Sequence, residues 1–365
     1  MKRQTAVVTV IGLGLIGGSL SHALKKQGVT VRGVSSERTV RKALEMGIID
    51  EGHTYSGIEQ AVSGSGVVFV CTPLLDTEKR LQHVFRSAEK NTVVSDVGST
   101  KTHVCRRAEE LAGKGRYFIG GHPMAGSERR GVENATPYLF YDAVWVLTPL
   151  SGTPKRAIGI LSDLLSLIGA KVMILTPDLH DRIAASVSHL PQLLAVLLTN
   201  HLANEDSDLC RNLAAGGFRD MTRIASSSYT VWRDILSTNS GEIRRALGRY
   251  KDMLESLVEQ LDNEDYLEKE FEMANDERKR IPKYTKGFLA PLCDLRVSVE
   301  DRPGELAKIT NLIFYHSINI KDIEIVTVRE GEGGVLRLGF SKKDEAETAA
   351  GVLTEAGYEV RGTYP

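Results

Sequence analysis

The sequence is poor in several features that would define a protein class. Its 365 residues include only four cysteines, and no two of them lie close together in the chain: Cys71, Cys105, Cys210 and Cys293. This spacing excludes a Cys-x-x-Cys metal or redox motif, so we expect no metal and reduced thiols in a reducing compartment. Charge is nearly balanced, with a formal net charge of −1 and a pI of about 6.8. Because no basic surface is available to attract a polyanion, we expect no nucleic acid partner.

The chain also lacks an apolar run long enough to suggest a membrane protein. The N-terminal stretch "MKRQTAVVTVIG" leads into a glycine turn rather than a cleavage site, so we interpret it as a strand and not as a signal peptide. The most apolar later stretch, "LPQLLAVLLTNHL", contains proline, glutamine and asparagine and is too short to span a bilayer. We therefore expect a cytoplasmic protein with no membrane partner.

Apolar strand-like runs alternate with helical patterns in the first half of the chain. These runs cover residues 6–12, 29–35, 66–73, 91–99, 116–123 and 142–149. Because they are apolar on both faces and separated by helices, they predict buried parallel strands in an α/β, doubly wound sheet of the Rossmann type. A helix over 153–170 and a strand over 171–175 complete the first domain, which we assign to residues 1–176.

Two further domains follow. Residues 177–290 show no strand pattern, and the long helix at their start has Thr176 as its N-cap and Pro177 in its first turn. We predict an all-helical second domain that ends in the linker "IPKYTKGFLAP". Residues 291–365 then read strand-helix-strand-strand-helix-strand, the order of a ferredoxin-like (βαββαβ) module.

The stretch "GLGLIGGS" has the G-x-G-x-x-G spacing of a dinucleotide-binding loop, and it follows a strand and opens a helix, as that motif requires. The glycines permit a tight turn and close approach of the pyrophosphate to the helix N-terminus. We assign ten residues to cofactor binding: Gly12, Leu13, Gly14, Leu15, Ile16, Gly17, Ser35, Arg38, Thr72 and Pro73. A nicotinamide dinucleotide is the cofactor that this motif favours.

The type of dinucleotide stays open between NAD and NADP. Where an acidic residue would bind the ribose hydroxyls, at the end of the second strand, this chain has Ser35, followed by Ser36, Glu37 and Arg38. A serine with a nearby arginine suits a 2′-phosphate, although Glu37 could still reach the ribose.

Polar residues follow neighbouring strands of the predicted sheet. Ser99 and Lys101 come after the fourth strand, and His122 follows the fifth in the loop "GGHPMAGSE". The carboxyl ends of parallel strands form the ligand-binding edge of an open sheet, so Ser99 and His122 can meet there, with the serine orienting the imidazole. A helix cap for Ser99 and a packed histidine for His122 are the structural alternatives.

The helical domain adds two polar segments. "SVSHLPQ" places His189 beside a kink at Pro191, which cannot donate to the carbonyl of Val187. "AAGGFRDMTRIASSSYTVW" carries Gly217, Asp220, Arg223 and Trp232. An arginine offers the fork of donors that a carboxylate needs, and Asp220 could pair with Arg223.

In this order, the stretches "GLGLIGGS", "DVGSTK", "GGHPMAGSE", "SHLPQ" and "AAGGFRDMTRIASSS" make the chain resemble the prephenate dehydrogenase family over residues 6 to about 290. The resemblance implies that prephenate is oxidised and decarboxylated to 4-hydroxyphenylpyruvate, on the route to tyrosine. His122 would accept the ring hydroxyl proton, Ser99 would orient His122, and Arg223 would hold a substrate carboxylate. His189, Gly217, Asp220, Trp232, Ser127 and Glu128 would line the substrate pocket. The family implies NAD as first choice of cofactor and a homodimer.

The tail, with "VEDRPGELAKITNLI", resembles an ACT domain, which implies tyrosine as an effector. The residues concerned are Asp301, Pro303, Gly304, Glu305 and Leu306, where a helix N-terminus suits an α-carboxylate; an ACT-like fold that mediates only association is the alternative. Two other functions remain open: arogenate dehydrogenase, with NAD or NADP, and a non-catalytic sensor of nicotinamide and amino acids.

Overall fold

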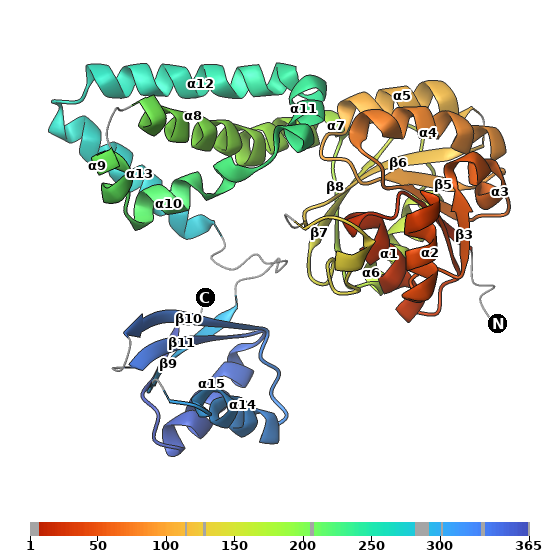
Figure 1. The fold of residues 1–365 in the computed structure, drawn as a ribbon. Coiled ribbons are helices and arrows are strands. Elements are labelled where there is room, and N and C mark those ends of the chain that lie inside the picture. The colour runs from red at the N-terminus through yellow and green to blue at the C-terminus, as the bar shows by residue number, and fades with distance from the viewer. Residues whose placement is uncertain are drawn as a thin grey trace. The chain divides into compact units, whose positions relative to one another are not determined.

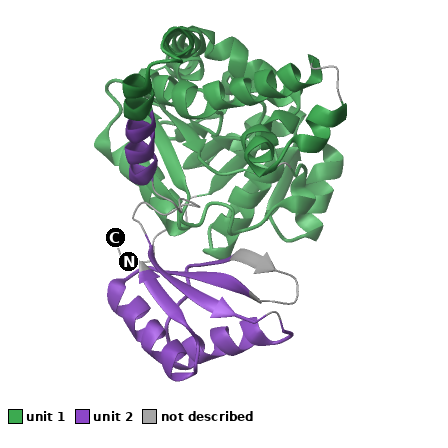
Figure 2. Ribbon diagram, turned by 90° about the vertical axis from the view of Figure 1, so that its left-hand side faces the viewer, with its two compact units in different colours: residues 1–270 green, residues 271–365 purple. Residues whose placement is uncertain are grey.

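The computed structural model describes residues 7–113, 115–126, 129–204, 208–281, 292–300, 302–329 and 333–363. The chain divides into two compact units, residues 1–270 and 271–365, which are described separately (Figure 2). The first unit contains both the sheet and most of the helical segment that follows it. Our division into three domains, with boundaries after residues 176 and 290, stays a prediction.

A single sheet of eight strands forms the centre of the N-terminal half of unit 1 (Figure 1). Its strands are β1 (Val8–Ile11), β2 (Val31–Ser35), β3 (Glu51–Thr54), β4 (Val67–Val70), β5 (Val93–Asp96), β6 (Tyr117–Pro123), β7 (Val144–Pro149) and β8 (Lys171–Ile174). Their order is β3-β2-β1-β4-β5-β6-β7-β8, so the strand order reverses between β1 and β4. Ligands bind at such a switch point, at the carboxyl ends of the strands.

Helices cover both faces of the sheet, as the doubly wound prediction requires (Figure 1). They are α1 (Leu15–Lys26), α2 (Glu37–Glu45), α3 (Ile58–Val62), α4 (Leu74–Ser87), α5 (Thr102–Ala112) and α6 (Lys155–Leu167), with short 3-10 turns η1 (Tyr55–Gly57) and η2 (Val132–Asn134). Each face has its own apolar core, one around Leu20, Phe69 and Trp145 and the other around Leu81 and Phe118. The four neighbouring strands β2, β1, β4 and β5 are almost completely buried, which explains their unbroken apolar runs.

The structure corrects the predicted sheet in two places. β7 runs antiparallel to β6, although all other neighbours in this sheet are parallel. A parallel connection needs a crossover, usually a helix, and in the described part of the β6–β7 link only the single turn η2 is helical. The edge strand β3 was missed because its sequence, EGHT, is polar and partly exposed.

The rest of unit 1 is helical, as predicted. It consists of α7 (Pro177–Ala184), the π-helical turn η3 (Ala185–His189), α8 (Leu190–Asn204), α9 (Asp208–Leu213), α10 (Gly216–Thr222), the 3-10 turn η4 (Arg223–Ser226), α11 (Tyr229–Thr238), α12 (Ser240–Glu259) and α13 (Glu264–Arg280), whose end reaches into unit 2. The Thr176 side chain caps α7 at the amide of Leu179, and Pro177 occupies its first turn. Before Pro191, where we predicted a kink, the structure has the π-helical turn η3, and the helix continues through it.

This continuity corrects our statement that the apolar stretch "LPQLLAVLLTNHL" is too short to span a bilayer. The stretch Pro177–Asn204 forms one helix of 28 residues, which is long and apolar enough to cross a membrane by length and composition alone. Core helices of soluble proteins meet the same criterion. Here the helix carries the buried polar residues His180, Asp181 and His189, which bond to other elements of unit 1.

Unit 2 contains a four-stranded antiparallel sheet with two helices. Its elements are β9 (Cys293–Val299), α14 (Glu305–Tyr315), β10 (Asp322–Arg329), β11 (Gly333–Phe340), α15 (Lys343–Glu355) and β12 (Val360–Thr363). The strand order is β10-β11-β9-β12, and the predicted sequence of elements is present. Leu295, Leu338 and Ile309 belong to a core of its own.

Candidate active site

The glycine loop after β1 has the shape that a dinucleotide needs. Gly12 has a φ of +96°, and a Cβ there would lie 2.5 Å from the carbonyl oxygen of Cys71. A Cβ at Gly17 would lie 1.9 Å from the carbonyl oxygen of Gly12, so only glycine lets α1 start this close to β1. Gly14, the N-cap of α1, has no atom within 4 Å of its would-be Cβ. This open space, beside the unpaired amides of a helix N-terminus, fits a pyrophosphate.

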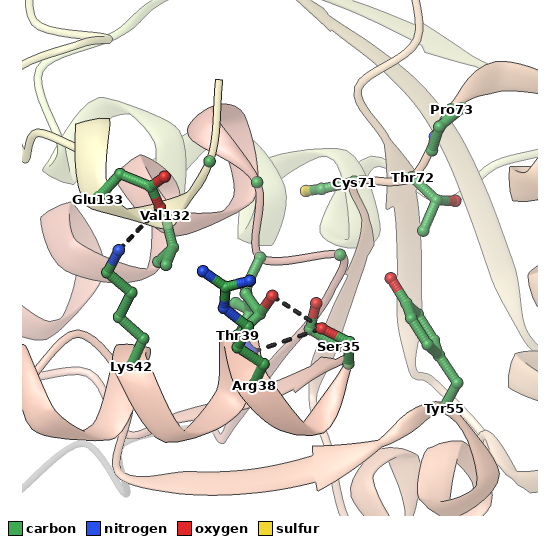
Figure 3. A pocket seen from close by; sticks show the side chains of 15 residues that line it. Ser35, Arg38, Thr39, Lys42, Tyr55, Cys71, Thr72, Pro73, Val132 and Glu133 are labelled. Carbon is green, nitrogen blue, oxygen red and sulfur yellow. Dashed lines mark hydrogen bonds and ion pairs between the residues drawn. The ribbon is translucent and has the colours of Figure 1, made fainter. Parts of the chain in front are cut away.

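A cavity of about 580 Å³ continues from this loop along the carboxyl ends of β1, β2 and β4 (Figure 3). Most of the residues that we predicted to bind the cofactor line it: Gly12, Leu13, Gly14, Ser35, Arg38, Thr72 and Pro73. Leu15, Ile16 and Gly17 form the adjoining first turn of α1. The sequence analysis named Ser36 next to Ser35 without assigning it to cofactor binding, and it did not single out the other lining residues: Thr39, Lys42, Tyr55, Cys71, Gly131, Val132 and Glu133. An aromatic ring, hydroxyl groups and two cations in one cavity suit the adenosine half of a dinucleotide.

The backbone before His122 is held by two buried side chains. Pairing between β5 and β6 ends at Ser95 and Ile119, so the next residues of β6 lack a strand partner on that side. Asp96 Oδ1 accepts a hydrogen bond from the Gly121 amide at 3.1 Å, and Lys101 Nζ donates to the Gly121 carbonyl at 2.7 Å. Lys101 is fully buried, and its charge is matched by Asp96 at 2.5 Å. The Asp96–Lys101 pair therefore extends the sheet and fixes the strand that presents His122.

His122 is linked to a second histidine and a carboxylate from α7. Its Nδ1 lies 2.8 Å from Nε2 of His180, and Nδ1 of His180 lies 2.8 Å from Oδ1 of Asp181. Asp181 also accepts the backbone amides of Lys101 and Thr102, at 2.7 and 2.8 Å, at the start of α5. His180 and Asp181 are almost completely buried. This relay joins α7 to β6 and α5, and it leaves Nε2 of His122 as the ring atom outside the chain of bonds.

The relay determines which nitrogen of His122 can accept a proton. An ionised carboxylate only accepts, so Nδ1 of His180 donates to Asp181, and a neutral His180 then accepts at Nε2. Nδ1 of His122 must therefore carry the hydrogen, and Nε2 keeps its lone pair. This is the tautomer that a general base needs.

The surroundings keep His122 unprotonated. Burial is the main cause that holds the pKa of His122 well below its ordinary value of 6.5. The neighbouring His180 and Lys101 lower this pKa further, and Asp181 opposes them. Burial alone would raise the pKa of Asp181, but its hydrogen bonds with His180 and with Thr102 reverse the effect and lower it. At neutral pH the relay thus holds a charged Asp181 and a neutral, proton-accepting His122.

Ser99 does not take the orienting role that we predicted for it. The structure gives Nδ1 of His122 to His180, which the sequence analysis did not single out. Ser99 lies half-buried in the loop between β5 and α5, and among the described residues its hydroxyl has no hydrogen-bond partner. A role for Ser99 toward substrate or cofactor stays a prediction.

His189 is part of a buried layer around the relay. The Asn239 side chain donates to the backbone carbonyl of Asp181 at 2.8 Å and lies 3.3 Å from Nδ1 of His189. The Trp232 ring packs edge-on against His189, with centroids 5.9 Å apart. Burial lowers the pKa of His189 to about 4, so this ring is also neutral. The structure therefore places His189 and Trp232 beside the relay, and their role in lining the substrate pocket stays a prediction.

The predicted carboxylate-binding segment lies next to this layer. Gln192 donates to the carbonyl of Ile224, the residue after Arg223, and so fixes η4 against the start of α8. Arg223 itself is exposed, as are Gly217 and Asp220 on the preceding helix α10. In the described part of the chain, Asp220 and Arg223 form no ion pair, so that predicted pairing is absent. Ser127 and Glu128 lie outside the described residues.

In unit 2, the predicted regulatory residues surround the start of α14. Gly304 has a φ of +94° and is the N-cap of this helix, which explains the glycine after Pro303. Glu305 accepts a hydrogen bond from the Tyr358 hydroxyl at 2.8 Å, and Leu306 is 45% exposed. Asp301 lies outside the described residues.

Comparison with known proteins identifies the family. A family model described as the nucleotide-binding domain of prephenate dehydrogenase matches residues 20–174, and one described as its dimerization domain matches residues 176–273. The prephenate dehydrogenase of Bacillus subtilis (strain 168) is 36% identical over an alignment of 360 residues. The match covers 96% of this chain and 96% of that protein. The chain belongs to the prephenate dehydrogenase family. It is thus an NAD(P)-dependent dehydrogenase, and its sheet and cavity form a nicotinamide-dinucleotide domain.

Solved structures of the family share the fold of unit 1. Prephenate dehydrogenase from Aquifex aeolicus, in complex with hydroxyphenyl propionate and NAD+, has a TM-score of 0.70 and 28% identity, and the match covers 77% of this chain and 99% of that chain. Arogenate dehydrogenase from Synechocystis has a TM-score of 0.69 and 30% identity, with 75% and 99% covered. The second of the two domain models ends at residue 273 and unit 2 begins at residue 271, so unit 2 lies almost entirely beyond both models.

Proposed function

We propose that this chain oxidises and decarboxylates prephenate to 4-hydroxyphenylpyruvate, with His122 as the general base and a nicotinamide dinucleotide as the hydride acceptor. The observation that carries the proposal is the Asp181–His180–His122 relay, which leaves an unprotonated nitrogen at the carboxyl edge of a dinucleotide-binding sheet. The name of the Bacillus relative, which is similar over almost the whole chain, supports the same substrate.

The chemistry follows from where the proton can go. The bound nicotinamide ring supplies the acceptor for the hydride from the substrate carbon that bears the hydroxyl. His122 Nε2 takes the hydroxyl proton at that carbon, so the C–O single bond becomes a carbonyl. Loss of CO2 then makes the ring aromatic, and the proton held by His122 can return to the oxygen. The buried charge of Asp181 stabilises the imidazolium that forms in between, acting through His180.

The substrate is a dicarboxylate, and Arg223 is the residue that we propose binds one of its carboxylates. A guanidinium forms paired, charge-assisted hydrogen bonds with a carboxylate. Ser99 would contact the reacting hydroxyl or the cofactor. The substrate pocket would be lined by His189, Trp232, Gly217, Asp220, Ser127 and Glu128.

Arogenate remains the alternative substrate, since a solved relative of similar likeness is named an arogenate dehydrogenase. Arogenate carries an amino group where prephenate has a side-chain carbonyl. A non-catalytic sensor is the remaining alternative. It is disfavoured by the relay, which has no evident use in a protein that only binds its ligands.

We also propose three properties of the whole molecule. Unit 2 is an ACT domain whose Gly304 turn and α14 N-terminus bind tyrosine as a feedback inhibitor, supported by its βαββαβ order and the left-handed Gly304. The helical segment forms a homodimer, supported by exposed apolar side chains such as Val187, Leu197 and Val258, at 64%, 58% and 69%. The enzyme is cytoplasmic, in keeping with four free cysteines.

The test of function is to incubate the full chain with prephenate or arogenate and either NAD or NADP, and to follow the absorbance of reduced nicotinamide. We expect reduction with prephenate. Reduction only with arogenate would make arogenate the substrate. No reduction with any pair of substrate and cofactor would refute the enzyme and leave the non-catalytic sensor as the function. Tyrosine added to the same assay tests feedback, since unchanged activity would refute it.

A further inference from the structure

The cavity has a distinct group of side chains where β2 ends, at the position that faces the adenosine ribose in a Rossmann-type site. Ser35 is the last residue of β2, lines the cavity and is 6% exposed. The Ser36 hydroxyl caps α2 by accepting a hydrogen bond from the amide of Thr39 at 3.4 Å, and it lies 2.9 Å from the hydroxyl oxygen of Thr39. Arg38 follows in the first turn of α2 (Figure 3). This end of the cavity thus presents hydroxyl groups and a guanidinium.

A carboxylate for the ribose hydroxyls is missing from this group. Glu37 was the only acidic candidate next to Ser35 in the sequence, but it is not among the residues that line the cavity. Its carboxylate instead pairs with Arg41, one helical turn further along α2, at 3.3 Å on the exposed side. A dinucleotide with free 2′- and 3′-hydroxyls would therefore lack a carboxylate acceptor at the end of β2, where such an acceptor normally stands.

The charge at this end is positive. Lys42 and Glu133 also line the cavity and pair with each other at 3.3 Å, so they offset each other. The charge of Arg38 also contributes to lowering the pKa of Glu133. Arg38 forms no hydrogen bond or close ion pair within the described ranges of the chain, so its guanidinium keeps its donors for a ligand. Figure 3 shows Arg38 between the Lys42–Glu133 pair and Ser35.

We propose that this chain selects a dinucleotide that carries a 2′-phosphate, NADP rather than NAD, and that Arg38 is the specificity-determining residue. The phosphate takes the place of the missing carboxylate: it accepts hydrogen bonds from Arg38 and from the hydroxyls of Ser35 and Ser36. NAD is the more common cofactor in the family, but in this chain the side chains at the end of β2 favour NADP. The inference rests on the proposed function only for the presence of a dinucleotide in this cavity.

The test measures binding rather than turnover. Calorimetric titration of the full chain compares three adenosine fragments: 2′,5′-ADP, 3′,5′-ADP and 5′-AMP. We expect 2′,5′-ADP to bind at least about tenfold tighter than 5′-AMP, the low end for charge-assisted hydrogen bonds to one phosphate. The 3′,5′-ADP fragment controls for charge alone, and it should bind more weakly than 2′,5′-ADP. Equal binding of all three, or tighter binding of 5′-AMP, would overturn the proposal.

Three variants locate the effect. Arg38→Ala should remove most of the preference for 2′,5′-ADP. Arg41→Ala, on the same helix but paired with Glu37 outside the cavity, is the matched control and should keep it. Ser35→Asp should reverse the preference, because a carboxylate repels the phosphate and accepts the ribose hydroxyls. A preference that survives in Arg38→Ala would refute the role of Arg38.

These outcomes are separate from those that test the reaction. If 2′,5′-ADP binds preferentially but prephenate is never oxidised, the cofactor inference stands and the proposed function fails. If prephenate is oxidised equally well with NAD, and the fragments bind equally, the function stands and the cofactor inference fails.

Discussion

The relay through His180 makes a prediction that separates orientation of His122 from simple packing. His180→Leu removes the acceptor of the His122 Nδ1 hydrogen and the link to Asp181, both of which form 2.8 Å contacts in the structure. A hydrogen bond that becomes charged as His122 takes up its proton contributes about 1.5–3 kcal/mol. Since about 1.4 kcal/mol corresponds to a tenfold change in rate, kcat should fall by about 10–150-fold, with little change in KM.

The assay is initial-rate formation of reduced nicotinamide over a range of prephenate concentrations, alongside thermal unfolding. His180→Gln is the informative companion, because its amide oxygen can still accept from His122 although it cannot pass on the charge of Asp181. It should recover part of the lost rate. His83→Leu changes a histidine that is 46% exposed and serves as the control. A folded His180→Leu with the kcat of the wild type would refute the relay.

Three other predictions follow from single sites. In steady-state kinetics, Arg223→Ala should raise KM for prephenate far more than it lowers kcat. Arg219→Ala, on the preceding helix, should not raise KM in this way. A loss confined to kcat in Arg223→Ala would contradict the binding role. Because burial lowers the pKa of His189 to about 4 from 6.5, the unfolded chain binds this proton first, and stability falls as the pH drops through that window. Between pH 6.5 and 4, the free energy of unfolding measured with urea should fall by about 3 kcal/mol more in the wild type than in His189→Asn. An equal fall in both proteins would contradict this prediction. Gly14→Ala should weaken dinucleotide binding in calorimetry without lowering the melting temperature. Gly17→Ala should lower the melting temperature, since only the Cβ at position 17 would meet backbone. A melting temperature that falls in Gly14→Ala but not in Gly17→Ala would refute our interpretation of the loop.

Much of the nucleotide site could be predicted from the sequence because its signals are local. The glycine spacing, the strand before it and the helix after it lie within a short segment, and each imposes its own backbone requirement at Gly12 or Gly17. The buried strands were likewise recognisable from their unbroken apolar runs. The edge strand β3 was not, since an exposed polar strand has no such pattern. The direction of β7 depends on the absence of a crossover helix, which short loop patterns do not reveal.

The Asp181–His180–His122 relay could not be predicted because its parts are far apart in the chain. His122 and His180 are 58 residues apart, and Lys101 and Asp181 are 80 apart. Their shared place at the carboxyl edge of the predicted sheet favoured Ser99 as the partner of His122, but tertiary packing of α7 against α5 and β6 brings His180 there. The only signal was the adjacent His180 and Asp181 near the start of the long helix, because polar side chains that become buried need a partner.

The central claim is that His122 is the base that removes the substrate hydroxyl proton. Its most direct test is the turnover of prephenate by His122→Asn at saturating substrate and cofactor, compared with the wild type. The account predicts a fall in kcat of about 10²–10⁴-fold, while calorimetry still detects binding of the dinucleotide. A His122→Asn enzyme that reduces nicotinamide at the rate of the wild type would contradict it.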